Sequence, residues 1–172
     1  MVRSADVDDR DAVLGVVAAA FTSPGYDPRD EVDIVVRTWD LDACPAGFEL
    51  VALADCIIGH VMAAVGDLAG RPAIGIAPLS VAPDHQRQGV GSALMTELLA
   101  RVEAAGWPFA LLLGDPAYYR RFGFEPAAGA GISYMPVGAG NPHFMLRRLA
   151  PVANGTGGEF RYCWETPSPP SA

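Results

Sequence analysis

The feature that most constrains this chain is an apolar strand that leads through a polar turn into a Gly-x-Gly pair and then a helix. The stretch runs from Leu79 to Met95, with the glycines at Gly89 and Gly91. Glycine lets the backbone approach an anion without a Cβ in the way and adopts positive φ, and we expect both properties at these positions. The following helix directs unpaired N–H groups and its positive dipole end at the same place. The stretch therefore predicts a cradle for a pyrophosphate.

Two common phosphate loops do not fit this stretch. A P-loop needs a lysine after its second glycine, but Ser92 follows Gly91 and the chain contains no lysine. A dinucleotide-binding loop needs a third glycine three residues after Gly91, where Leu94 stands. The cradle therefore belongs to another class of phosphate site.

The glycine pair forms part of a longer pattern, Gln86-x-x-Gly89-x-Gly91. This pattern resembles motif A, the acetyl-coenzyme A pyrophosphate loop of the GNAT superfamily of N-acetyltransferases. The resemblance extends over residues 2–164, which is nearly the whole chain.

A second motif follows downstream, in the order that the resemblance leads one to expect. Residues 114–124 read Gly-Asp-Pro-Ala-Tyr-Tyr-Arg-Arg-Phe-Gly-Phe and resemble motif B of the same superfamily. Tyr119 stands four residues before the Gly-Phe pair. The sequence of this segment is similar to that of one bacterial subgroup of N-acetyltransferases, in which the acetyl acceptor is generally unassigned.

The resemblance implies an α/β fold with a mixed central sheet of six to seven strands, flanked by about four helices. Two parallel strands, 74–81 and 109–113, would splay apart and admit the pantetheine arm of the coenzyme. Pro78 cannot donate to a strand ladder, so it predicts a bulge or an edge at the splay. We expect an acetyltransferase domain over residues 1–165 and a disordered Pro- and Ser-rich tail over 166–172.

Hydrophobic periodicity and turn residues predict the remaining elements. They are a helix ending near Thr22, a second helix capped by Asp30, a hairpin of strands 48–53 and 57–65, a turn at 67–72, a helix over 91–105, a short helix from Pro116 to Gly123, and strands 144–149 and 159–164. In the resembled family the N-terminal helix pair covers the acceptor site.

Acetyl transfer to an amine needs bound reactants, a neutral amine and a stabilised thiolate. The resemblance assigns Tyr119 as the general acid, because a phenol can donate a proton to the thiolate; Tyr118 is the alternative. The base is open, because strand 74–81 contains no acid. Asp115, which also fits a helix cap, is one candidate, His143 is another, and a water chain to bulk solvent is a third.

The residues expected to bind the coenzyme come from the strand end, the glycine loop and motif B. They are Leu79, Ser80, Val81, Gln86, Arg87, Gln88, Gly89, Val90, Gly91, Ser92, Tyr118 and Arg120. Backbone N–H groups of the loop would bind the pyrophosphate, with Arg87 or Arg120 as its charge partner. No metal is expected, because the spacings of the three cysteines match neither a metal pair nor a disulfide framework.

Composition narrows the function classes. The chain has 172 residues, 51% of them hydrophobic, which is enough for one core. The acidic start and the lack of a long apolar run predict a cytoplasmic protein. The net charge of −8 argues against nucleic-acid binding. A monomer or a homodimer is expected.

The leading hypothesis is therefore an N-acetyltransferase that moves an acetyl group from acetyl-coenzyme A to a primary amine of a small molecule or a peptide. Two alternatives stay open: a non-catalytic acyl-coenzyme A binding or sensing module, and a toxin that acetylates aminoacyl-tRNA. The net charge of −8 counts against the toxin. The sequence identifies neither the acceptor nor whether longer acyl groups are used.

Overall fold

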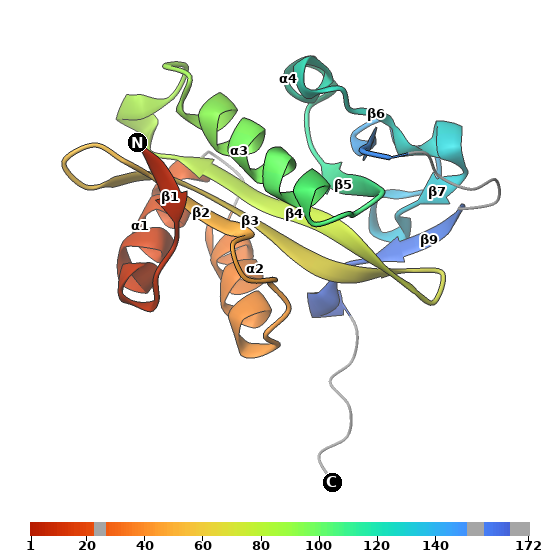
Figure 1. Cartoon of the computed structure of the whole chain (residues 1–172), viewed down its shortest axis with the longest axis horizontal. Coiled ribbons are helices and arrows are strands. Elements are labelled where there is room, and N and C mark those ends of the chain that lie inside the picture. Colours follow the sequence, from red (N-terminus) through yellow and green to blue (C-terminus); the bar gives the residue numbers. More distant parts are fainter. Residues whose placement is uncertain (23–26, 151–156, 166–172) are drawn as a thin grey trace, which may run out of the picture.

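The structure is a computed structural model that describes residues 1–22, 27–150 and 157–165. A twisted mixed sheet runs through the molecule, with helices on both of its faces (Figure 1). The strands pair in the order β1 (Val2–Ser4), β2 (Glu49–Leu53), β3 (Ile57–Leu68), β4 (Arg71–Val81), β5 (Phe109–Leu113), β8 (Phe144–Arg148) and β6 (Glu125–Pro126). The short strand β7 (Ile132–Ser133) pairs with β9 (Gly158–Arg161), which also pairs with the far end of β3.

The helices divide between the two faces of the sheet. Figure 1 shows α1 (Arg10–Ala20) and α2 (Arg29–Asp40) below the sheet and α3 (Val90–Ala104) above it. The short helix α4 (Pro116–Tyr119) follows β5 and continues into a 3-10 turn, η3 (Arg120–Phe122). The predicted α/β architecture, with a mixed sheet between about four helices, is confirmed.

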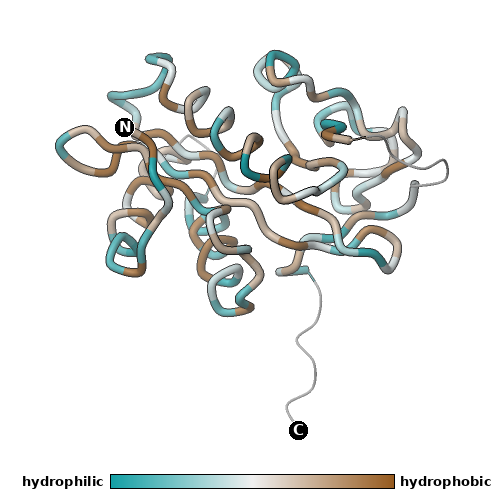
Figure 2. Tube along the Cα trace, viewed as in Figure 1, coloured by the Kyte–Doolittle hydropathy of each residue, from teal (hydrophilic) through white to brown (hydrophobic). Residues whose placement is uncertain are grey.

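Packing of apolar faces explains these elements. On α3, Leu94, Met95, Leu98, Leu99 and Val102 are at most 1% exposed. They recur at helical spacing and pack on the upper face of the sheet, in a cluster with Ile74 and Ile76. Figure 2 shows the same pattern along the chain, with apolar segments concentrated in the central strands and polar ones at the outer turns.

The predicted splay lies between β4 and β5. Their parallel pairing runs only from Ile74–Ala110 to Ile76–Leu112, while β4 continues to Val81. On the other side of β4, the register with β3 shifts between Val61 and Ala63, so that Pro78 falls in a bulge. The bulge expected at Pro78 is therefore confirmed, and no strand among the described residues pairs with the β5 side of β4 beyond Ile76.

Several predicted boundaries were wrong. The turn expected over 67–72 is only two residues long, because β3 and β4 stay paired as far as Leu68 and Arg71, and Ala69 and Gly70 close the hairpin with positive φ. Helix α2 starts one residue before Asp30.

At the other end, the strand expected over 159–164 stops at Arg161. The chain then turns into a 3-10 segment, η6 (Cys163–Glu165), because the Glu165 carboxylate and backbone N–H both bond to the backbone of Tyr162. The predicted tail 166–172 lies outside the described residues.

Candidate functional site

The glycine loop lies at the start of α3, and its two glycines serve different purposes. Gly89 is the N-cap residue and has φ +87°, which glycine adopts without strain. Gly91 lies in the first helical turn and does not have positive φ, so that part of the expectation was wrong. A Cβ on Gly91 would instead lie 2.8 Å from Tyr118 Oη. Glycine is therefore needed at position 91 because the Tyr118 hydroxyl lies close to the backbone, and at position 89 because the backbone has positive φ.

Side chains of the loop hold its shape. Gln86 Nε2 donates to the carbonyl of Val81 at 3.0 Å, and Gln88 Nε2 donates to the carbonyl of Asp84 at 2.8 Å. Arg87 has φ +58°, which is uncommon for a residue with a Cβ. These two bonds tie the loop to the end of β4 and to the turn before it, just ahead of the N-terminus of α3, where helix N–H groups favour an anion.

A cavity of about 590 Å³ lies between this loop and motif B. Its walls come from the end of α1, the end of β4, the glycine loop and the motif B segment. The lining residues are Ala20, Phe21, Leu79, Val81, Gln86, Arg87, Gly89, Gly91, Ser92, Asp115, Tyr118, Tyr119 and Arg121. We call this space the cradle cavity.

Most of the predicted coenzyme residues line the cradle cavity, but Ser80, Gln88, Val90 and Arg120 do not. Strand alternation turns the Ser80 side chain to the opposite face, where it is 1% exposed. The Val90 side chain packs toward the core, and Gln88 is used in the loop bond described above.

Arg121 lines the cradle cavity, although the sequence pointed to its neighbour Arg120. Its guanidinium carbon lies 4.7 Å from the centre of the Tyr118 ring, and its Nε donates to the Tyr118 carbonyl at 2.9 Å. Positions i and i+3 share a face of a helical segment, so the spacing of three residues already indicated that Arg121 lies beside Tyr118.

The two motif B tyrosines meet edge to face, with ring centres 5.0 Å apart. Tyr118 lies over Gly91, whereas the Tyr119 ring lies so close to Gly114 that a Cβ there would collide with it. Burial raises the pKa of Tyr119 well above its ordinary value, and the phenol of Tyr118 and the carboxylates of Glu31 and Asp115 raise it further. Tyr119 therefore keeps its proton at neutral pH and is available as a donor.

Asp115 and His143 were the two candidate bases. The Asp115 carboxylate caps α4, with Oδ1 accepting the Ala117 N–H at 2.8 Å, and it also lines the cradle cavity. His143 is exposed, and its Nδ1 lies 3.2 Å from the carbonyl oxygen of Gly114. His143 does not line the cradle cavity.

A second cavity of about 290 Å³ lies at the splay and shares Phe21, Leu79, Asp115 and Tyr119 with the first. We call it the aromatic cavity. Its other walls are formed by Glu31 and Ile34 of α2, Ile76 to Pro78 of β4, Leu113 at the end of β5, Gly114 after it, and Tyr134, Tyr162 and Trp164. The sequence did not indicate Glu31, because its place depends on how α2 packs on the sheet. Tyr119 thus lies where the two cavities meet.

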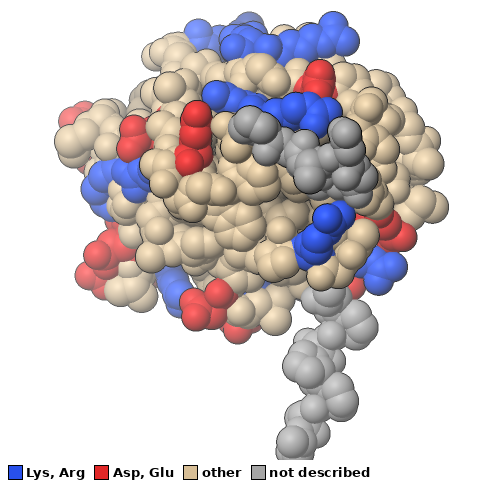
Figure 3. All heavy atoms as spheres, turned by 45° about the vertical axis from the view of Figure 1, so that its right-hand side comes forward, with Lys and Arg blue, Asp and Glu red and all other residues tan. Residues whose placement is uncertain are grey.

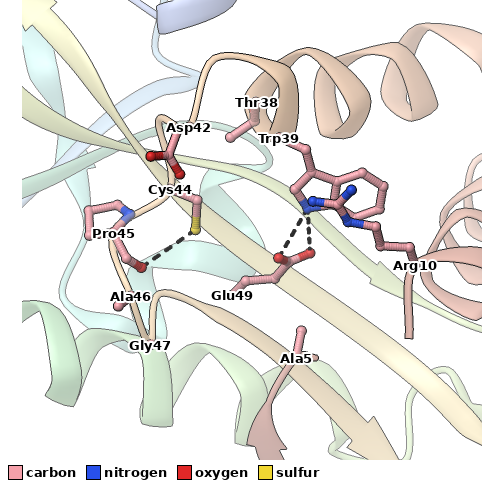
Figure 4. A pocket seen from close by; sticks show the side chains of 10 residues that line it. All are labelled: Ala5, Arg10, Thr38, Trp39, Asp42, Cys44, Pro45, Ala46, Gly47 and Glu49. Carbon is pink, nitrogen blue, oxygen red and sulfur yellow. Dashed lines mark hydrogen bonds between the residues drawn. The ribbon is translucent and has the colours of Figure 1, made fainter. Parts of the chain in front are cut away.

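A third, polar pocket of about 220 Å³ shares no lining residue with the other two (Figure 4). Within it, the Glu49 carboxylate accepts from Trp39 Nε1 at 3.2 and 3.1 Å, and His60 Nε2 lies 2.9 Å from Glu49 Oε1. Arg10 lies over the Trp39 ring at 4.7 Å. Burial raises the pKa of the Cys44 thiol to about 12, so that this thiol is a poor nucleophile at neutral pH.

Charge is distributed unevenly over the surface. Figure 3 shows arginine side chains along the upper edge of the molecule, the edge at which Figure 1 places α4 and the start of α3. Arg87, Arg120 and Arg121 of these segments are exposed. In a chain of net charge −8, this is a local positive region beside the cradle cavity.

Within residues 1–22, 27–150 and 157–165, no three metal-ligating side chains gather into a potential metal site. The same residues include no helix with the length and apolar character needed to span a bilayer.

Comparison with known proteins identifies relatives of this chain. A family model described as an acetyltransferase (GNAT) domain matches residues 1–127. The uncharacterized N-acetyltransferase YhbS of Escherichia coli K12 is 36% identical over 109 residues, which are 62% of this chain and 65% of that protein. The match therefore spans just under two thirds of the length of this curated relative.

Solved structures extend the likeness over nearly the whole chain. The structure of Escherichia coli YhbS in complex with CoA superposes with a TM-score of 0.83 at 28% identity, covering 94% of this chain and 88% of that one. A GNAT family acetyltransferase from Brucella melitensis in complex with acetyl-CoA gives a TM-score of 0.78 at 28% identity, covering 94% of both chains.

Proposed function

The chain belongs to the GNAT acetyltransferase family, and we propose that it transfers an acetyl group from acetyl-coenzyme A to a primary amine of a small molecule or a peptide. The observation that carries this proposal is the meeting of two cavities at Tyr119, one beside an anion cradle and the other across the splay. Relatives solved with CoA and acetyl-CoA support the choice of donor.

The residues of the cradle fit the phosphates of the coenzyme. The backbone from Arg87 to Ser92 presents N–H groups at the start of α3, and a Cβ at Gly91 would fill space needed there. Arg87 and Arg121 line the same cavity and would neutralise phosphate charge. The free edge of β4 from Ala77 to Val81 would hold the pantetheine arm by backbone hydrogen bonds.

The bound coenzyme would supply an acetyl group activated as a thioester. This chain would contribute mainly by holding both reactants at the splay, because effective molarities can reach about 10⁵ M or more. Tyr119 is the proposed general acid: it is protonated, and it lies between the two cavities. Asp115 is the proposed base, since this residue lines both cavities while its Oδ1 caps α4.

The testing experiment combines coenzyme binding with turnover. Titration calorimetry with acetyl-coenzyme A measures binding, and chromatographic detection of coenzyme A measures turnover over a panel of amines, amino acids, polyamines, aminoglycosides and peptides. Chromatography is preferable to thiol reagents, because Cys56 is an exposed free thiol. Binding without turnover of any acceptor supports a non-catalytic acyl-coenzyme A module instead, and no binding refutes the proposal.

A further inference from the structure

The aromatic cavity has a distinct chemistry. Five of its lining residues are aromatic, namely Phe21, Tyr119, Tyr134, Tyr162 and Trp164. Two are carboxylic acids, Glu31 and Asp115, and among the described residues no Arg, Lys or His lines it. A volume of about 290 Å³ is close to the lower end for small-molecule sites. The cavity therefore fits a small ligand that combines an apolar body with positive charge.

Contacts among its rings fix the aromatic wall in place. Tyr162 and Trp164 stack with ring centres 4.3 Å apart, and Tyr134 meets Tyr162 edge to face at 5.4 Å. Glu165 joins the two tyrosines, because it accepts from the Tyr134 hydroxyl and from the Tyr162 backbone N–H. A wall that is ordered in this way loses little entropy when a ligand binds.

One polar atom in the wall is left without a protein partner. The Tyr162 side chain is 3% exposed, and within the described part of the chain its Oη makes no hydrogen bond of normal geometry, although the backbone of Leu113 lies near it. Buried hydroxyls are normally bonded, so an unpartnered one beside a cavity is a place for a ligand or a water molecule. This observation is independent of the two carboxylates.

Charge then selects the class of ligand. Glu31 lies in the first turn of α2 and is half-buried, so that its carboxylate acts through a partly desolvated medium. An ammonium group is attracted both by a carboxylate and by the faces of aromatic rings. A carboxylate on the ligand would meet Glu31 and Asp115 with no cation among the lining residues, and juxtaposed like charges are strongly unfavourable.

We propose that the acceptor is a small arylalkylamine or alkylamine, which places its ammonium group at Glu31 and its apolar body among the rings, and which has no carboxylate beside the amine. This inference rests on the proposed acetyl transfer. The ammonium first loses one proton to solvent by way of Asp115. The neutral amine nitrogen then bonds to the acetyl carbon, and the C–S bond breaks. Tyr119 gives its proton to the departing sulfur, and the second proton lost by the nitrogen restores the Tyr119 hydroxyl.

The test compares amines with the amino acids that differ from them by one carboxylate. The pairs are tyramine and tyrosine, tryptamine and tryptophan, and phenethylamine and phenylalanine, with coenzyme A formation followed by chromatography. We expect kcat/KM to be at least about 100-fold higher for each amine. Equal rates for the two members of each pair, a preference for polyamines, aminoglycosides or peptides, or no turnover of any amine would overturn the inference.

A matched pair of variants tests the role of Glu31. Glu31→Gln should raise the KM for tyramine by about 10-fold or more with kcat changed much less, because the carboxylate binds the ammonium in the ground state. Asp33→Asn is the control, since Asp33 lies on the same helix but is exposed and outside the cavity. Glu31→Asp, which keeps the charge, should recover part of the affinity. Unchanged KM in a folded Glu31→Gln protein contradicts the assignment.

Calorimetry separates this inference from the function on which it rests. If acetyl-coenzyme A does not bind the wild-type protein, the proposed function itself fails. If it binds and the acceptors that react carry a carboxylate beside the amine, only the acceptor class is wrong.

Discussion

Replacing Gly91 by valine should destroy the coenzyme site while leaving the fold intact. The new Cβ would lie 2.8 Å from Tyr118 Oη and 3.5 Å from Val81 Cγ2, and valine adds two further methyl groups. Tyr118 has to swing away, and it takes with it the Arg121 guanidinium that lies 4.7 Å from its ring centre. The substitution therefore fills the space beside the first N–H groups of α3 and displaces a cation from the same cavity.

The size of the effect follows from the hydrogen bonds that are lost. Hydrogen bonds to charged groups contribute about 1.5–3 kcal/mol each, so losing two of them to phosphate costs about 3–6 kcal/mol. That energy corresponds to a Kd for coenzyme A about 10²- to 10⁴-fold weaker. The assay is titration calorimetry with coenzyme A on protein whose circular dichroism matches the wild type.

A matched control isolates the steric argument. Gly15 is also a helical glycine, but a Cβ there meets no atom within 4 Å. Gly15→Val should therefore bind coenzyme A as the wild type does. A folded Gly91→Val protein that keeps wild-type affinity would refute the placement of the pyrophosphate at this loop.

Three further predictions concern the tyrosine, the aspartate and the polar pocket. Tyr119→Phe should lower kcat by about 10²- to 10⁴-fold with little change in the Kd for coenzyme A, whereas the same pattern in Tyr118→Phe would show that the motif is read one residue out of register. Because burial raises the pKa of Tyr119, its protonated form persists as pH rises, so kcat should not fall on the alkaline side below about pH 10. Asp115→Asn keeps a side chain that can cap α4, but it removes the proposed base, so it should lower kcat/KM and abolish any pKa in the pH profile that is the same for all acceptors. An unchanged pH profile that follows each acceptor's own ionisation would instead favour water as the base. Glu49→Ala leaves the donors of Trp39 and buried His60 unpaired and should cost about 1–3 kcal/mol in urea unfolding, while Glu97→Ala, which breaks an exposed pair with Arg101, should cost well under 1 kcal/mol.

The fold class was predicted from the resemblance of motifs A and B to the GNAT superfamily, whereas several individual features could be predicted because they are local. The glycine loop, the helix after it and Pro78 each depend on residues that are close along the chain, and their backbone requirements can be derived from residue type. The glycine at Gly89 and the bulge at Pro78 were predictable for that reason. The shortened hairpin turn at Ala69 and Gly70 was not, because an alanine at φ +50° is unusual.

The parts of the site that sequence reasoning missed depend on packing between distant segments. Gly91 was assigned the wrong requirement because its neighbour, Tyr118, approaches only after β5 has returned beside β4. Arg121 is the exception, because it lies three residues after Tyr118 in a helical segment, so its place could have been predicted from local spacing. No sequence pattern indicated that Glu31 lines the aromatic cavity, since this residue comes from the N-terminal helix pair on the other face of the sheet.

The order of elements explains why the reacting groups would meet at Tyr119. Parallel strands need a crossover, and α3 provides it between β4 and β5, so the loops that follow both strands leave the sheet at the same edge. The glycine loop follows β4 and motif B follows β5, which brings Gly91 and Tyr118 into contact. Because the two strands stop pairing at Ile76, the space between their ends is not closed by a ladder, and it opens toward α2 and Glu31 on the other face. Tyr119 on motif B is therefore placed where both acetyl-coenzyme A held by the glycine loop and an amine bound beneath the sheet would reach it.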